Sequence, residues 1–270
     1  MGDRLQGKVA IVTASGSGIG RACALRFAAE GAVVVVNDIR PDAAREVVTE
    51  IEAAGGRATA VIADVSRSAE VDAMVEETVA RFGRLDVLLN NAAAPCFGRV
   101  EQMTDDLWRQ VFAVTLDGTF YGMRAAIPVM TAQGGGSIIN TSSAAGLGGV
   151  PGIAAYGAAK AAVVNLTKTA AVENAARNVR VNSICPGSID TPPLRAFVDA
   201  LPGGRTAFER QIPARRIGRA AEIASVALFL ASDEASYVTG AVIVADGGAV
   251  AGIGASWPDP GEPTPAERRE

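Results

Sequence analysis

Short apolar runs rich in β-branched residues alternate with Ala-rich segments of helical period along nearly the whole chain. The apolar residues of these runs are nearly continuous, which is typical of strands covered on both faces. Repeated alternation of strand and helix predicts a doubly wound parallel sheet of about seven strands, with right-handed crossovers and helices on both faces. We expect the strands at 9–14, 32–38, 59–64, 85–91, 137–142, 179–184 and 241–247.

The pattern runs without an internal repeat or an interdomain linker. We therefore expect a single α/β domain over residues 1–255. The tail at 256–270 is rich in Pro and in charged residues, a composition that predicts disorder.

The connection at 188–216 is long for a sheet of this kind. Long connections in compact domains are often lids over a ligand, so we expect a substrate lid here. An apolar side at helical spacing predicts a short amphipathic helix within it, formed by Leu194, Phe197, Val198 and Leu201.

Composition excludes several classes of protein. The 270 residues have a formal net charge of −4 and contain no block of Lys or Arg, so we expect no nucleic-acid partner. The cysteines Cys23, Cys96 and Cys185 are far apart and in no C-x-x-C spacing, which argues against a disulfide framework or a metal site. The N-terminal residues resemble neither a signal peptide nor a membrane span, so we expect a cytoplasmic protein without a membrane partner.

Histidine is absent from the sequence. Its absence removes the Ser-His-Asp triad and most catalytic zinc sites. Acid–base chemistry in this protein must therefore use Tyr, Lys or carboxylate groups.

A glycine-rich turn follows the first expected strand and opens an Ala-rich helix, with glycines at Gly16, Gly18 and Gly20. Such glycines let backbone amides and the helix N-terminus approach a pyrophosphate, although glycines also simply end strands. Because an acidic residue ends the next strand, the pattern indicates dinucleotide binding and a Rossmann fold.

That acidic residue is Asp38. Its carboxylate is suited to accept both hydroxyl groups of an adenosine ribose and would repel a 2′-phosphate, so NAD is favoured over NADP. The alternative is that Asp38 caps the next helix, but Pro41 is typical of a first helical residue, which places the cap at Arg40. The Arg40 guanidinium keeps NADP open as the less favoured cofactor, because it could hold a 2′-phosphate.

Three side chains are candidates for the chemistry. Tyr156 and Lys160 are four residues apart in a segment of strong helix formers, so they project from one helix face. Ser143 follows an expected strand, at the carboxyl edge where open α/β sheets bind ligands. Its hydroxyl would orient a substrate oxygen; the alternative is that Ser142 and Ser143 only satisfy the amides of a turn.

A tyrosine with an ordinary pKa near 10 must lose roughly 3 units to act as a base near neutral pH, which is about 4 kcal/mol. An ammonium group about 4 Å away supplies roughly this at an intermediate dielectric constant of about 20. We therefore expect Lys160 to lower the pKa of Tyr156.

Further motifs accompany these residues. They are the T-x-x-x-G-x-G-like turn from Thr13 to Gly20, Asp64, Asn90-Asn91-Ala92, Ser143, the Y-x-x-x-K pair Tyr156/Lys160, Pro186-Gly187 with Thr191, and Asp246-Gly247-Gly248. With these motifs the chain resembles the short-chain dehydrogenase/reductase family over about residues 7 to 249.

The resemblance implies the roles of the site residues. Tyr156 would be the general acid/base, Lys160 would bind the nicotinamide ribose and lower the tyrosine pKa, and Ser143 would hold the substrate oxygen. It also implies a homo-oligomer, either tetramer or dimer. The implied cofactor site comprises Ser15, Ser17, Gly18, Ile19, Gly20, Asp38, Asp64, Val65, Asn91, Ala92, Tyr156, Lys160, Pro186, Gly187, Ile189 and Thr191.

The sequence departs from the family pattern at two positions. Ala14 stands where the family has a first glycine, which is tolerable only if its φ is negative and its methyl group avoids the diphosphate. Thr115 stands where the family has a catalytic asparagine that holds a relay water. Its hydroxyl would either bond back along its own helix or hold that water less rigidly, and we expect activity with a changed pH profile.

These observations predict an NAD-dependent oxidoreductase that transfers hydride between the cofactor and a secondary alcohol or ketone. One alternative is an NADPH-dependent ketoreductase, for example of 3-oxoacyl thioesters. Another is a catalytically silent nucleotide-sensing module, which the presence of all three catalytic residues disfavours.

The substrate pocket should be walled by residues 94–97, 144–150 and 194–201, which are largely apolar and suit an uncharged cyclic or aliphatic alcohol. An anionic substrate is the alternative, because four lid arginines could meet a carboxylate or phosphate instead of forming a solvated face. These are Arg195, Arg205, Arg210 and Arg215.

Overall fold

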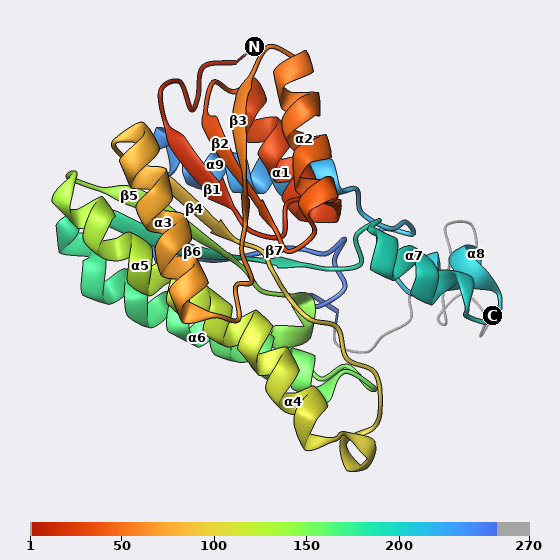
Figure 1. Cartoon of the computed structure of the whole chain (residues 1–270). Helices are drawn as coiled ribbons and strands as arrows, with labels where there is room; N and C mark the ends of the chain where they lie inside the picture. The colour runs from red at the N-terminus through yellow and green to blue at the C-terminus, as the bar shows by residue number, and fades with distance from the viewer. Residues whose placement is uncertain (1, 253–270) are drawn as a thin grey trace, which may run out of the picture.

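Seven parallel strands form one sheet in the order β3-β2-β1-β4-β5-β6-β7 (Figure 1). The computed structural model describes residues 2–252, so the expected tail at 256–270 and the expected domain end lie outside the described residues. The strands are β1 Val9–Val12, β2 Val33–Asp38, β3 Arg57–Ile62, β4 Val87–Asn90, β5 Gly136–Thr141, β6 Val179–Pro186 and β7 Val242–Ala245.

Helices cover both faces of this sheet. Figure 1 shows α1, α2 and α9 on one side and α3, α5 and α6 on the other, while α7 and α8 project beside the sheet. Within residues 2–252, every helix is too short or too polar to span a lipid bilayer. The α-helices are α1 Gly18–Ala29, α2 Pro41–Ala53, α3 Ser68–Phe82, α4 Asp105–Phe112, α5 Gly118–Ala132, α6 Ala154–Asn174, α7 Pro192–Asp199, α8 Gly204–Glu209 and α9 Ala220–Ala231.

The near-continuous apolar runs are explained by the two helical layers. Along β1, Ala10 and Val12 pack in the core beneath α1 and α9, whereas Ile11 packs in the core beneath α3 and α5. Successive side chains of a strand point to opposite faces, so both the odd- and the even-numbered residues must be apolar where both faces are covered. The prediction of a single-domain Rossmann fold is confirmed.

Complete burial holds for inner strands but not for the two edge strands. All residues of β1, β2 and β4 are buried, whereas β3 and β7 are largely half-buried or exposed. Ile62 and Val244 are examples of exposed apolar residues there. The edge strands have a neighbour on one side only, which their sequence does not reveal.

The strand order reverses between β1 and β4. The chain passes from β1 to β2 on one side, and β4 then pairs with β1 on the other side, with Val12 opposite Leu89. Open α/β sheets bind ligands outside the carboxyl ends of their strands at such a switch point. The loops after β1, β4 and β5 therefore frame the candidate site.

The segment at 188–216 folds into α7, α8 and their connections. Val198 of α7 is buried with Ile212 and Ile217, and Leu194 and Phe208 pack against them. A short amphipathic helix is present as predicted and has a small core of its own, but it ends at Asp199, so Leu201 lies beyond it.

Candidate active site

The glycine-rich turn is bonded to the end of β2. The Ser15 amide donates to the Asn37 carbonyl at 2.8 Å, and the Gly16 amide donates to Asp38 Oδ2 at 2.9 Å. A Cβ atom on Gly20 would lie 2.3 Å from the Ala14 carbonyl oxygen, so only glycine fits there. This turn opens α1 at Gly18, whose φ of 56° is left-handed.

Ala14 contradicts the negative φ that its side chain was expected to need. Its φ is 48°, in the left-handed region. For a residue with a Cβ atom this conformation costs roughly 1–2 kcal/mol. The Asn91 amide group donates to the carbonyls of Thr13 and Ala14, at 3.1 and 3.4 Å, and helps to hold the strained turn.

Thr13 joins the ends of β1 and β4, a role that its sequence position did not reveal. Its Oγ1 accepts the amides of Asn91 and Ala92, at 2.9 and 3.2 Å. The predicted residues of these two strand ends are therefore together at the switch point. A hydroxyl residue at a strand end is too common a pattern to have predicted this contact.

Asp38 is 6% exposed and lies against both the glycine turn and Arg40. Its Oδ1 accepts the Arg40 amide at 3.0 Å and Nε at 3.3 Å. The exposed Arg40 guanidinium also donates to Ser17 Oγ at 3.3 Å. As predicted, α2 begins at Pro41 with Arg40 as the preceding residue.

The structure brings Ser143, Tyr156 and Lys160 together at the carboxyl end of β5. Lys160 Nζ lies 5.6 Å from the centroid of the Tyr156 ring and donates to the Thr141 carbonyl. The Ser143 hydroxyl lies close enough to the Tyr156 side chain to act on its pKa. Ser143 Oγ also accepts the Ala145 amide at 3.1 Å, the turn contact weighed as an alternative.

Ser142 does not satisfy a turn amide. Its hydroxyl donates to the Lys160 carbonyl at 2.7 Å, and so fixes α6 against the end of β5. The bond joins the two elements that carry Ser143 and Lys160.

Burial dominates the electrostatics of this site. It lowers the pKa of Lys160 from 10.5 to about 7, because the 2% exposed ammonium has lost its hydration. Burial also raises the pKa of Tyr156, an effect that the nearby Ser143 hydroxyl opposes. The pKa of Tyr156 is therefore raised where Lys160 was expected to lower it, because desolvation is the largest cause and Lys160 is not among the groups that shift it.

Thr115 is fully buried in a π-helical segment, Ala113–Asp117, between α4 and α5. Its Oγ1 accepts the Ala94 amide at 3.2 Å, so the hydroxyl meets a neighbouring loop instead of bonding back along its own helix. Thr119 makes such a backward bond, to the Thr115 carbonyl at 2.8 Å. Single π-helical turns are frequent at functional sites, and the sequence did not predict this one.

The other predicted cofactor residues lie along the same strand ends. Asp64 Oδ1 accepts both the amide and the hydroxyl of Ser66, at 2.9 and 2.7 Å, while Val65 is buried against Gly118.

On the opposite side of the site, Pro186 ends β6 and Thr191 precedes α7. The Thr191 methyl would lie 3.1 Å from a Cβ on Gly18, which brings this residue to the glycine turn. Between them, Gly187 packs on Asp246 and Ile189 pairs with Gly218.

These residues fit a dinucleotide. The close contacts at Gly16 and Gly20 leave room only for glycine, and the turn leads directly into the N-terminus of α1, which suits it to bind a pyrophosphate. At the end of β5, the buried Thr141 hydroxyl has no hydrogen-bond partner among the described residues, which leaves a polar group for a ligand. Among residues 2–252, no group of three or more Cys, Asp or Glu side chains is arranged to hold a metal ion.

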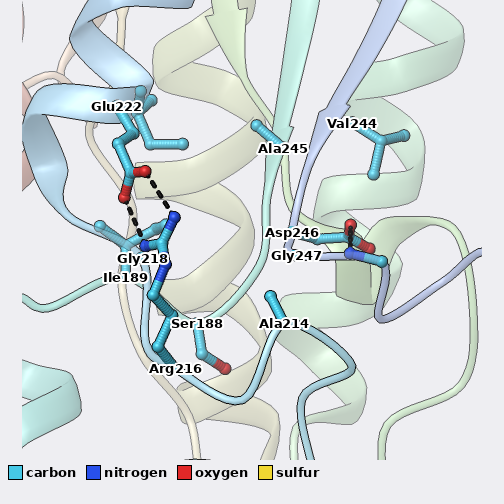
Figure 2. Close-up of a pocket in the computed structure, with 12 residues that line it drawn as sticks. Ser188, Ile189, Ala214, Arg216, Gly218, Glu222, Val244, Ala245, Asp246 and Gly247 are labelled. Carbon is cyan, nitrogen blue, oxygen red and sulfur yellow. Dashed lines mark hydrogen bonds and ion pairs between the residues drawn. The ribbon is translucent and has the colours of Figure 1, made fainter.

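A pocket of about 300 Å³ lies beside the lid (Figure 2), and neither Ser143 nor Tyr156 is among the residues that line it. Its lining includes Ser188, Ile189, Ala214, Arg216, Gly218, Glu222, Val244, Ala245, Asp246 and Gly247. Figure 2 shows the Arg216 guanidinium facing the Glu222 carboxylate, with bonds of 2.8 and 2.7 Å. This ion pair joins the end of the lid segment, after α8, to α9.

Comparison with known proteins assigns the family. A family model described as enoyl-(acyl carrier protein) reductase matches residues 13–250. Cyclohexanol dehydrogenase of Acinetobacter sp. (strain SE19) is 42% identical, covering 92% of this chain and 96% of that protein. The 3-oxoacyl-[acyl-carrier-protein] reductase FabG of Thermotoga maritima is 43% identical, covering 92% and 99%.

A solved structure gives the same result. The structure of a 7α-hydroxysteroid dehydrogenase complexed with NADH and 7-oxo glycochenodeoxycholic acid superposes with a TM-score of 0.86 at 36% identity, covering 91% of this chain and 95% of that one. The fold and site are those of an oxidoreductase that uses a nicotinamide dinucleotide. The chain belongs to the short-chain dehydrogenase/reductase family and transfers hydride between that cofactor and a secondary alcohol or ketone.

The pKa of Lys160 predicts a pH-dependent cost in stability. Because the pKa falls from 10.5 to about 7 on folding, the unfolded chain binds this proton more tightly. The cost is full below about pH 7 and fades as the pH rises toward about 10.5. We expect Lys160→Met to raise the free energy of unfolding by a few kcal/mol at about pH 6, and this gain to shrink by about 1.4 kcal/mol per pH unit above about pH 7.

Urea denaturation without cofactor, at about pH 6 and about pH 9.5, measures this difference. Lys168→Met is the matched control, because Lys168 is an exposed residue of the same helix. The account of Lys160 fails if its variant gains the same free energy at both pH values.

Proposed function

We propose that the protein is an NAD-dependent dehydrogenase/ketoreductase in which Tyr156 is the general acid/base, Ser143 holds the substrate oxygen, and Lys160 holds the nicotinamide ribose. One observation carries the proposal: the half-buried Tyr156 lies beside Ser143, whose hydroxyl opposes the rise of its pKa, and Lys160 Nζ lies beside its ring. That arrangement places a proton donor and acceptor next to a second hydroxyl and a cation, at the sheet edge where ligands bind.

In alcohol oxidation, Tyr156 accepts the proton of the substrate hydroxyl while Ser143 donates a hydrogen bond to the substrate oxygen. The ammonium form of Lys160 favours the tyrosinate electrostatically, and the Thr141 carbonyl fixes its Nζ. A bound nicotinamide dinucleotide supplies the hydride acceptor, and in ketone reduction the hydride donor. In reduction, Tyr156 returns the proton to the substrate oxygen.

The cofactor lies, in this proposal, across the ends of the strands on both sides of the switch point. Asp64 and Val65 would border its adenine, and Ile189 and Thr191 would contact its nicotinamide amide. The remaining contacts come from Ser15, Ser17, Gly18, Ile19, Gly20, Asp38, Asn91, Ala92, Tyr156, Lys160, Pro186 and Gly187.

Asp38 supports the preference for NAD. Its buried carboxylate accepts the Gly16 amide in the phosphate-binding turn, which suits it to accept ribose hydroxyl groups as well. The Arg40 guanidinium is paired with this carboxylate and with Ser17, so it is engaged before a 2′-phosphate arrives.

The substrate is an uncharged apolar alcohol or ketone, with the segment at 188–216 as its lid. Phe97, in the loop after β4, stacks on Phe197 of α7 at 5.7 Å between centroids, so aromatic rings join the two walls. The lid arginines Arg195 and Arg205 are both paired with Asp190, which disfavours an anionic substrate. The similarity to a cyclohexanol dehydrogenase supports the same substrate class.

A specific observation keeps one alternative open. The exposed Arg40 guanidinium beside the turn, together with the similarity to a 3-oxoacyl-[acyl-carrier-protein] reductase, favours NADPH-dependent reduction of 3-oxoacyl thioesters as the second candidate. In either case we propose a cytoplasmic homo-oligomer, a tetramer or dimer. Exposed apolar side chains on α5 and α6, Phe120 and Val172, support self-association.

Removal of the Tyr156 hydroxyl tests the catalytic assignment. We expect Tyr156→Phe to lower kcat for cyclohexanol oxidation by about 100-fold or more, because the general acid/base is lost. NADH fluorescence titration should give an unchanged Kd, since the ring remains. Full turnover by the variant would refute the role of Tyr156.

Asp38 predicts the choice of cofactor. We expect the wild-type protein to bind NADH more tightly than NADPH, and Asp38→Asn to reduce this preference by at least about 10-fold, because the charge that repels a 2′-phosphate is removed. Asp42→Asn is the control, since Asp42 is an exposed residue at the start of α2. A wild-type preference for NADPH would mean that Arg40, and not Asp38, determines the cofactor specificity, and it would favour the second candidate function.

A further inference from the structure

The helix that carries Tyr156 and Lys160 begins without a cap of its own. The residue before α6, Ile153, has no side chain that bonds the amides of the first turn. Those amides have no intrahelical acceptors, so a buried helix start needs partners from elsewhere. Tyr156 is the third residue of α6, and its amide is one of these groups.

Cys96 supplies the missing acceptor. Its Sγ accepts the Tyr156 amide at 3.3 Å, although the two residues are 60 positions apart in the chain. The Cys96 side chain is 3% exposed and lies in the apolar cluster that contains Ala94 and Ala155 and packs against Tyr156. The sulfur is therefore a fixed part of the surroundings of Tyr156.

The loop that carries Cys96 is fastened at two further points. The Ala94 amide donates to Thr115 Oγ1 at 3.2 Å, which ties the loop to the π-helical segment. The Gly98 amide donates to the Gly152 carbonyl at 3.0 Å, just before α6. The loop thus runs from the buried Thr115 to the backbone of the catalytic tyrosine.

We propose that the segment from Ala94 to Gly98 is a brace in which Thr115 and Cys96 are positioning residues for Tyr156. The proposal rests on the proposed role of Tyr156 as the acid/base. A misplacement of about 1 Å at a reacting group can cost about 100-fold in rate, so a bond to the tyrosine backbone matters even though sulfur is a weak acceptor. In this brace, Thr115 acts through Ala94 and Cys96 without touching the substrate.

The brace also affects the pH profile. The titratable groups that face Tyr156 are Lys160 on the same helix, Cys185 on β6 and Cys96 on the loop, with the Ser143 hydroxyl also close to its side chain. If Tyr156 moves away from Ser143, the effect of the Ser143 hydroxyl that opposes the rise of its pKa weakens. Alcohol oxidation, which needs tyrosinate, then requires a higher pH.

The test compares Cys96→Ala, Thr115→Val and the double variant with Cys96→Ser and Thr115→Ser, which keep an acceptor atom. We expect Cys96→Ala and Thr115→Val each to lower kcat for cyclohexanol oxidation by about 10-fold, to shift the acidic limb of the pH profile to higher pH, and to leave the Kd for NADH unchanged. The serine variants should retain most of the rate and the original pH profile. The double variant should be no slower than the slower single variant, because both substitutions break one connection.

Cys23→Ala is the matched control, since Cys23 is a buried cysteine of α1 in the other part of the core. It should lower thermal stability without shifting the pH profile. The brace is refuted if Cys96→Ala keeps the wild-type kcat and pH profile, if serine fails to restore them, or if the losses in the double variant multiply. Failure of the proposed function is a separate result: the wild-type protein would then bind NADH without oxidising alcohols.

Discussion

The burial of the Lys160 ammonium is the constraint on which the site depends. Removing this cation from water costs free energy, as its pKa of about 7 shows, and the protein offsets part of the cost with the Thr141 carbonyl. Thr141 is the last residue of β5, so its bond to Lys160 fixes the position of α6 along the sheet. The bond from the Ser142 hydroxyl to the Lys160 carbonyl holds α6 at the same position along the sheet. Tyr156, one turn earlier, is thereby held at the sheet edge.

The sheet makes this placement possible by bringing three strand ends to one edge. Parallel pairing aligns β1 with β4 and β4 with β5, and buried polar side chains continue the alignment into the helices. Asn90 donates to Asn140 at 2.9 Å, and Asn140 donates to Thr167 of α6 at 2.9 Å. These satisfied buried bonds specify one register where apolar packing alone would tolerate several. The apolar layers supply the stability, and the polar bonds between them set the positions of the strands and helices relative to one another.

Local sequence pattern was enough for the fold and for part of the site. Continuous apolar runs identified the strands, and the spacing of Tyr156 and Lys160 placed both on one helix face, because these features depend on neighbouring residues. The exposed edges, the left-handed Ala14 and the contact of Cys96 with Tyr156 were not predictable in this way. Each depends on residues distant in the chain. The pKa of Tyr156 was misjudged for a related reason: the sequence shows which charges are near, but not how far burial has removed them from water.

The central claim is that this site moves a hydride from the carbinol carbon of an apolar secondary alcohol. Its most direct test is incubation of the protein with NAD and cyclohexanol deuterated at that carbon, followed by mass spectrometry of the dinucleotide. The reduced dinucleotide should carry one deuterium at the nicotinamide C4 position. Tight binding of the dinucleotide without transfer of the label to it, across a panel of cyclic and aliphatic secondary alcohols, would contradict the account and favour a nucleotide-sensing module.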